Sequence, residues 1–244
     1  MDGYRKELKF IVGDDVLLDV RNRIKALLRP DPHQKGDHYR IRSIYFDSPS
    51  FVCCRENTAG VSPREKYRIR TYDCGRDTIV SEIKIRHRDT ISKMNALITE
   101  EVFYGLISGD IIRASRILSG LIDSGEYRNE REKRVLEKYL ARITADLYSP
   151  ACIIDYERSA YIYDIANVRI TIDRNITASD SFERMFDPAL TGRPVLDGNM
   201  HVLEIKYDEF LPGEISSVLS GMGLTRSSSS KYAMGLQRIK GVFA

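Results

Sequence analysis

The sequence predicts an α+β protein built on an antiparallel β-sheet that closes, or nearly closes, into a barrel or tunnel with helices outside it. Several short segments alternate polar and apolar side chains, as strands do when their two faces meet different surroundings. Other segments repeat apolar residues at helical spacing. Arg and Lys dominate the polar strand positions, and closing the sheet would place them in its lumen, with the apolar face under the helices.

The first half of the chain contains four predicted strands and a helix. The strands lie at residues 4–12, 38–47, 64–73 and 78–88. Asp14 or Asp15 caps a helix whose apolar residues recur at helical spacing and which Pro30 ends. A short helix or turn follows residue 49. The last two strands form a hairpin around Gly75.

The second half changes character. Leu, Ile and charged residues follow helical periods across residues 95–142, which predicts helices throughout that range. A turn near Ala166 divides the next strand segment in two. Strands are predicted over residues 151–174 and 200–208, a long loop over 176–199, and helices over 212–222 and 231–240.

Bulk properties narrow the class of protein. The 244 residues show no repeat or internal break, which favours a single domain over residues 1–244. The net charge of +3 is too modest for a general nucleic-acid binder. No apolar run approaches the ~18 residues of a spanning helix, and the charged N-terminus has no secretory signal. The four cysteines fit no zinc site or disulfide framework, so we expect a cytoplasmic protein with reduced thiols.

Basic side chains recur on one face of strand after strand. Lys66, Arg68 and Arg70 share a face, and Arg40 and Arg42 repeat the pattern more weakly. A solvated sheet face explains any single strand. Like charges side by side repel one another, however, so the whole set requires a balancing anion. Clusters of Arg and Lys are the chemistry of phosphate recognition.

Four acids occupy the same faces, namely Glu7, Glu82, Asp173 and Glu204. They are candidates for a divalent metal that bridges phosphate oxygens. Asp173 has the alternative role of supporting Arg169 or Lys206 through a salt bridge.

Several basic residues also have plainer explanations. Lys84 and Lys206 each follow a Glu by two residues, and such pairs contribute little when they are solvated. Lys231 follows four serines at a helix start, where an anion site and an ordinary serine cap explain it equally well. Lys93 is expected in a loop. Arg86, like Arg88, is expected at the rim or in solvent.

Other phosphate-binding and catalytic motifs are absent from the sequence. It contains no GxxxxGK[ST], no GxGxxG, no kinase motif set and no GxSxG. Phosphoryl transfer would therefore depend on positioning, basic residues and metal rather than on a covalent nucleophile.

The ordered motifs resemble the catalytic domain of the vacuolar transporter chaperone (VTC) family, the polyphosphate polymerases, which belong to the triphosphate tunnel metalloenzymes. The resemblance spans nearly the whole chain. It runs through RKELKF, YRIRSIYFD, EKYRIRTY, SEIKIR, SKMNA, DYERSAY, VRITIDR, HVLEIKYD and SSSSKYAMG. It implies transfer of the ATP γ-phosphate to a growing polyphosphate chain with release of ADP, in a basic tunnel that uses Mn²⁺ or Mg²⁺.

The resemblance also implies roles for individual residues. The catalytic residues would be Arg68, Arg70, Lys84, Arg158, Arg169 and Lys206. Further phosphate or nucleotide contacts would come from Lys9, Lys93, Lys231 and Tyr156, the last by stacking on a base unless it is simply packed. The metal ligands would be Glu204 and, more weakly, Glu7.

One motif departs from the wider superfamily. Its opening ExExK is incomplete because Arg5 stands at the first acidic position, ahead of Glu7 and Lys9. The resemblance therefore favours the polymerase branch over triphosphatases and class IV adenylate cyclases, which use more carboxylates. A tunnel hydrolase and a non-catalytic polyphosphate-binding module remain the alternatives. The sequence does not determine the oligomeric state.

Overall fold

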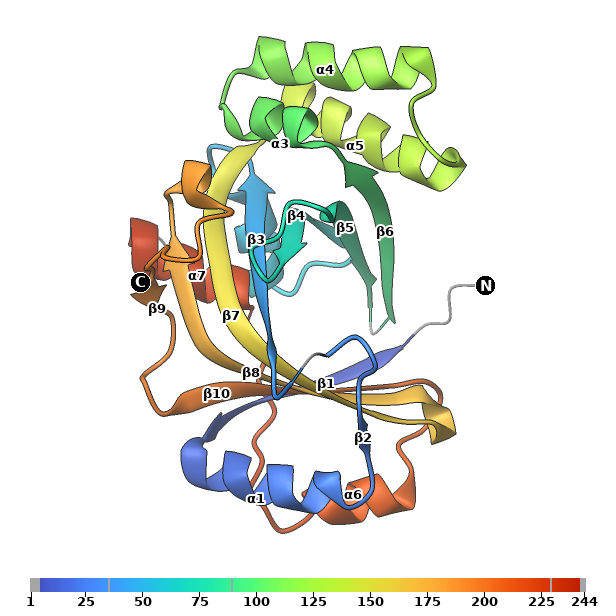
Figure 1. The fold of residues 1–244 in the computed structure, drawn as a ribbon, viewed down its shortest axis with the longest axis vertical. Coiled ribbons are helices and arrows are strands. Elements are labelled where there is room, and N and C mark those ends of the chain that lie inside the picture. Colours follow the sequence, from blue (N-terminus) through green and yellow to red (C-terminus); the bar gives the residue numbers. More distant parts are fainter. Residues whose placement is uncertain (1–4, 35, 89, 229, 242–244) are drawn as a thin grey trace.

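The computed structural model describes residues 5–34, 36–88, 90–228 and 230–241 (Figure 1). The strands are β1 Lys6–Gly13, β2 Arg29–Pro30, β3 Tyr39–Asp47, β4 Arg64–Tyr72, β5 Ile79–His87, β6 Thr90–Ile98, β7 Ser149–Tyr163, β8 Val168–Ser179, β9 Arg193–Pro194 and β10 Met200–Tyr207. The α-helices are α1 Asp14–Lys25, α2 Val52–Thr58, α3 Glu100–Ile107, α4 Ile111–Ser124, α5 Glu130–Asp146, α6 Gly213–Leu219 and α7 Lys231–Lys240.

All the strands belong to one antiparallel sheet that curves around a lumen. Its order is β1-β10-β8-β7-β3-β4-β5-β6, with β2 on β7 and β9 on β8. β1 and β6 are the ends of this order, so the barrel is not closed by hydrogen bonds among the described residues. The segment after α6 contacts the outer edge of β1, where the Ser227 amide donates to the Lys9 carbonyl at 2.8 Å.

Two hydrophobic cores cover the outer face of the sheet on either side of the lumen. α3, α4 and α5 stack over one side, and α1 and α6 over the other, while the long strands β7 and β8 bend across both (Figure 1). Helical spacing places Leu17, Val20 and Ile24 of α1 in the smaller core. Leu203 and Ile205 of β10 point into that core, so the alternate residues Glu204 and Lys206 point into the lumen.

The predicted α+β class and tunnel-like sheet with outer helices are confirmed. The hairpin of β4 and β5 and the final helix α7 have the predicted bounds within two residues. Three predictions about these elements were wrong. Gly13, and not Asp14 or Asp15, is the N-cap residue of α1. Residues 95–98 continue strand β6 instead of starting a helix, which places Lys93 on a strand and not in a loop. The loop predicted from residue 176 begins later, because β8 continues to Ser179 and pairs there with β7.

Within the described ranges, none of the helices combines the length and the apolar character needed to cross a membrane.

Candidate functional site

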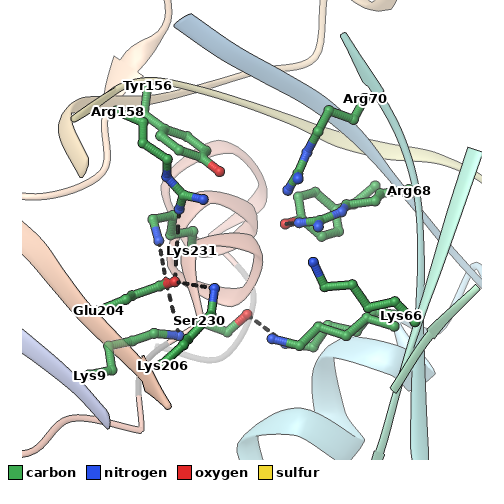
Figure 2. Close-up of a pocket in the computed structure, with 13 residues that line it drawn as sticks. Lys9, Lys66, Arg68, Arg70, Tyr156, Arg158, Glu204, Lys206, Ser230 and Lys231 are labelled. Atoms are coloured by element: carbon green, nitrogen blue, oxygen red, sulfur yellow. Dashed lines mark hydrogen bonds and ion pairs between the residues drawn. The ribbon is translucent and has the colours of Figure 1, made fainter. Parts of the chain in front are cut away.

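The lumen holds a central pocket of about 80 Å³ that is lined mainly by basic side chains (Figure 2). Its lining residues are Lys9, Tyr45, Lys66, Arg68, Arg70, Lys84, Lys93, Tyr156, Arg158, Glu204, Lys206, Ser230 and Lys231. Ten of the twelve predicted site residues are in this set, and the other two, Glu7 and Arg169, are not. The central pocket therefore gathers side chains from β1, β3 to β7, β10 and the start of α7.

Strand register explains why these side chains meet. Residues paired directly across neighbouring antiparallel strands share one face of the sheet. Lys9 of β1 pairs with Glu204 of β10, and Lys84 of β5 pairs with both Lys66 of β4 and Lys93 of β6. Figure 2 shows two walls facing each other, with Glu204 in one and the arginines of β4 in the other.

Glu204 is the hub of the first wall. Its carboxylate lies 2.8 Å from Lys231 Nζ, 3.2 Å from Lys206 Nζ, 3.5 Å from Lys9 Nζ and 3.8 Å from the Arg158 guanidinium. Burial opposes its ionisation, but Lys231, Lys206 and Lys9 outweigh burial and hold the pKa of Glu204 well below its usual value. Glu204 is therefore an anion throughout the neutral range.

Asp173 of β8 supports the same wall from behind. It is fully buried and accepts two hydrogen bonds from Arg158, at 2.6 and 2.7 Å, and lies 2.6 Å from Lys231 Nζ. Its carboxylate thus fixes two cations that point into the lumen. The sequence prediction that Asp173 supports Arg169 or Lys206 is wrong, because neighbouring strand β7 brings Arg158 directly opposite Asp173.

Glu82 of β5 holds the second wall together. It accepts a hydrogen bond from Arg68 and lies 3.8 Å from Arg70 and 3.9 Å from Lys93. Burial opposes its ionisation, but Arg68 and Arg70 dominate and lower the pKa of Glu82. Nine cationic side chains line the central pocket, and four carboxylates contact them. The described part of the lumen therefore has an excess of positive charge.

Burial also acts on the lysines that have weaker anionic support. Burial, reinforced by Lys84 and Lys9, lowers the pKa of Lys66 well below its usual value. Burial likewise lowers the pKa of Lys84, which Glu7 supports from 3.2 Å. Lys231 is the opposite case, since Asp173 and Glu204 overcome its burial and raise its pKa. A bound anion would favour the charged forms of Lys66 and Lys84.

The family model described as VTC domain matches residues 4–240. The chain belongs to the VTC domain family. No curated protein matches it in sequence.

Solved structures resemble this VTC domain at low sequence identity. A proposed adenylate cyclase from Bacillus halodurans is 12% identical with a TM-score of 0.51, and the match covers 100% of both chains. A proposed adenylate cyclase from Vibrio parahaemolyticus is 13% identical with a TM-score of 0.49, and the match covers 96% of this chain and 98% of that one. The Bacillus likeness shows a shared fold.

Two predicted residues of the VTC domain lie beside the central pocket. Arg169 faces a wide cavity of about 340 Å³ at the β1 and β6 edges and pairs with Asp31 at 2.8 Å. Glu7 lines the same wide cavity. Its carboxylate lies 3.2 Å from Lys84 Nζ, and this ion pair connects β1 to β5. Lys93 and Lys206 line both spaces. A ligand longer than the central pocket would reach Arg169.

Three lining residues were missing from the predicted site. Lys66 could have been found, because it alternates with Arg68 and Arg70 on the same strand. Ser230, the N-cap residue of α7, accepts a hydrogen bond from Lys66 Nζ at 2.8 Å and makes no capping hydrogen bond with its side chain. Tyr45 has no sequence signal, since its hydroxyl enters the lumen only through the pairing of β3 with β4, where Arg68 donates to it at 3.2 Å.

Tyr156 is already in contact with cations. The Arg158 guanidinium carbon and Lys231 Nζ each lie 5.2 Å from its ring centroid, within the range of cation–π attraction. The ring therefore helps to position both cations. Stacking of Tyr156 on a nucleotide base stays a prediction.

The carboxylates of this VTC domain fit a metal that arrives with a phosphate ligand. Glu204 and Glu7 are both ionised, because neighbouring lysines outweigh burial and lower the pKa of each. Across the described ranges, no group of three or more His, Cys, Asp or Glu side chains is placed to hold a metal ion. Mg²⁺ commonly takes one or two carboxylates and completes its shell with phosphate oxygens and water. The donor set suits that arrangement.

Proposed function

We propose that this VTC domain is an ATP-dependent polyphosphate polymerase. The observation that carries the proposal is the central pocket, in which cations from two facing walls outnumber the carboxylates that hold them. A triphosphate and a phosphate chain are linear anions of the kind that such a lumen neutralises. Membership of the VTC domain family supports the same reaction, as the sequence resemblance implies.

The proposed reaction is a phosphoryl transfer between two phosphate chains. An oxygen of the terminal phosphate of polyphosphate forms a bond with the γ-phosphorus of ATP. The bond between that phosphorus and the β–γ bridging oxygen breaks, and its electron pair leaves with ADP. The polyphosphate gains one phosphate, and the nucleophile is already an anion, so no protein base is required.

The residues would act by position and charge. Arg68 and Arg70 from one wall and Arg158 and Lys231 from the other would hold the transferring phosphate between them, with its equatorial charge neutralised on both sides. Mn²⁺ or Mg²⁺ held by Glu204, with Glu7 near, would shield the negative charge of the phosphate oxygens. The carboxylates Glu82 and Asp173 keep the arginines in place before the substrate arrives, which lowers the reorganisation needed for transfer.

The test is to incubate the purified protein with ATP and Mn²⁺ and to separate the products on a gel stained for polyphosphate. We expect a ladder of polyphosphate and an equal release of ADP. Free phosphate without a ladder would replace the proposal with a hydrolase of the same fold. Binding of ATP without any turnover would replace it with a polyphosphate-binding module.

A further inference from the structure

A second, smaller cavity continues from the central pocket toward the surface. It has a volume of about 50 Å³ and shares Lys9, Lys66, Lys84 and Ser230 with the central pocket. We call it the outer pocket. The residues that it adds are Glu7, Asn57, Arg64, Arg86 and Ser228. Arg86, which the sequence predicts at the rim or in solvent, is partly exposed and lines this outer pocket.

In the wall of the outer pocket, two neighbouring cross-strand pairs each consist of two cations. Arg64 of β4 is paired directly with Arg86 of β5, and Lys66 is paired directly with Lys84 two residues further along. Directly opposed like charges destabilise a pair of strands. Four cations on one face of a hairpin therefore form a ladder that an anion would stabilise.

Neither arginine of this ladder forms a salt bridge with a carboxylate of the described ranges. Arg64 donates to the Val61 carbonyl at 2.6 Å, and Arg86 donates to the Arg88 carbonyl at 3.0 Å. Both partners are neutral. Burial and then Arg86 lower the pKa of Arg64, and the attraction of Glu56 offsets them only in part. The carboxylate that lines the outer pocket, Glu7, is engaged by Lys84 and Lys9 at 3.2 and 3.4 Å.

The wide cavity beside the central pocket differs in this respect. Its arginine Arg5 lies 3.2 Å from Asp208, and Arg169 lies 2.8 Å from Asp31. Carboxylates of the protein thus already compensate these cations. The two openings of the lumen are both basic, but Arg5 and Arg169 form salt bridges, whereas Arg64 and Arg86 of the outer pocket form none with the described residues.

Resting on the proposed function, we infer that the outer pocket is a subsite for phosphate groups of a linear polyphosphate that extends beyond the central pocket, held by Arg64 and Arg86. The polyphosphate leaves the lumen between the β4–β5 hairpin and the serines Ser228 and Ser230. The Asn57 amide and the Ser228 hydroxyl line this path and offer further hydrogen-bond donors.

The experiment measures binding alone, so that it does not depend on turnover. Tripolyphosphate and a long-chain polyphosphate are titrated into the protein by calorimetry, without metal or ATP and at fixed ionic strength. Wild type should bind the long chain more tightly, and R64Q/R86Q should lower the ratio of long-chain to tripolyphosphate affinity about tenfold or more, because two charge-assisted contacts are lost. Removing the opposed charges should raise the melting temperature of the free variant, which shows that it is folded.

Two variants with the same change in charge serve as controls. R113Q/R116Q alters exposed residues of α4 and should leave the affinity ratio unchanged. R5Q/K6Q alters the wide cavity, and loss of the ratio in that variant, with retention in R64Q/R86Q, would overturn the inference. Wild-type protein that binds both chains equally would also overturn it. A polymerase ladder would still be possible in that case, so failure of the subsite and failure of the proposed function are separable.

Discussion

At the scale of single residues, the lumen is defined by carboxylates that each hold several cations. Glu204 contacts four cationic side chains, and Asp173 contacts two of them again from the buried side. Removing one partner of a buried ion pair is costly because the other charge stays buried. The stability of the free protein should therefore depend strongly on these acids.

Glu204→Gln should lower the free energy of unfolding by about 3 kcal/mol or more, because four cations lose their shared counter-charge. Tripolyphosphate without metal should then raise the melting temperature of the variant more than that of wild type, since phosphate replaces the missing anion. Denaturant unfolding and thermal melts measure both effects. Glu214→Gln on the exposed surface of α6 is the control and should change neither. Equal stability of E204Q and wild type would contradict the role of Glu204 as a hub.

The lowered pKa of Lys66 leads us to expect that the protein takes up protons when it binds tripolyphosphate. Its pKa is well below the usual value because of burial and then Lys84 and Lys9, so above that lowered pKa the free protein holds Lys66 neutral. A phosphate oxygen beside the amine favours the charged form and raises the pKa again. Tripolyphosphate binding should therefore take up protons in the window between the lowered pKa and the ordinary lysine value.

Calorimetry in buffers of different ionisation enthalpy, from neutral pH upward, measures this uptake. Lys66→Met should reduce it, whereas Lys133→Met on α5, outside the lumen, should not. An uptake that is the same in K66M and wild type would assign the titrating group elsewhere.

At the scale of elements, α7 packs closely against the sheet because one of its residues is a glycine. A Cβ at Gly235 would lie 2.2 Å from Ile154 Cδ1, 3.1 Å from Ala178 Cβ and 3.3 Å from Cys152 Sγ, all of which are buried. In a helix interior, glycine is less favourable than every other residue except proline. Its presence here allows the helix to approach β7 and β8 closely, and the approach sets where Lys231 enters the lumen.

Gly235→Ala should lower the free energy of unfolding by roughly 1 to 3 kcal/mol, as overpacking does, and should weaken tripolyphosphate binding by moving Lys231. Gly120→Ala is the matched control, since Gly120 lies inside α4 with no atom within 4 Å of the added Cβ. That control should gain up to about 1 kcal/mol from helix propensity. A G235A variant that is stabilised like G120A would show that α7 is free to shift.

The sequence predicts an element well where a local pattern of apolar and polar residues encodes it. The β4–β5 hairpin and α5 follow from local periodicity. Strand β6 does not, because its core residues Met94, Ala96 and Ile98 alternate with Leu97, an apolar residue that is 46% exposed, so the strand period is hidden in the sequence. The lumen cations follow from alternation, but the partners of Asp173 depend on a strand order that no local pattern encodes.

At the scale of the whole molecule, the sheet places a lumen with an excess of positive charge between two hydrophobic cores. A ligand of the folded state raises stability by mass action, by about 2.7 kcal/mol at a hundred times its dissociation constant. Tripolyphosphate at that level should raise the melting temperature by about 5 to 10 °C. Potassium chloride at equal ionic strength should produce a much smaller shift, because monovalent anions cannot span both walls. Equal shifts for both salts would reduce the effect to general screening.

In the part of the chain that the structure describes, no strand pairing joins β1 to β6, and this has a mechanical consequence. A closed barrel has its diameter fixed by strand number and shear, whereas here the aperture depends on the curvature of β7 and β8, each of which runs past both cores (Figure 1). Each of the two walls is backed by its own hydrophobic core, and β7 and β8 connect the two walls. A phosphate chain bound by cations of both walls would act as a cross-link, so the width of the lumen would be set jointly by the protein and by its ligand.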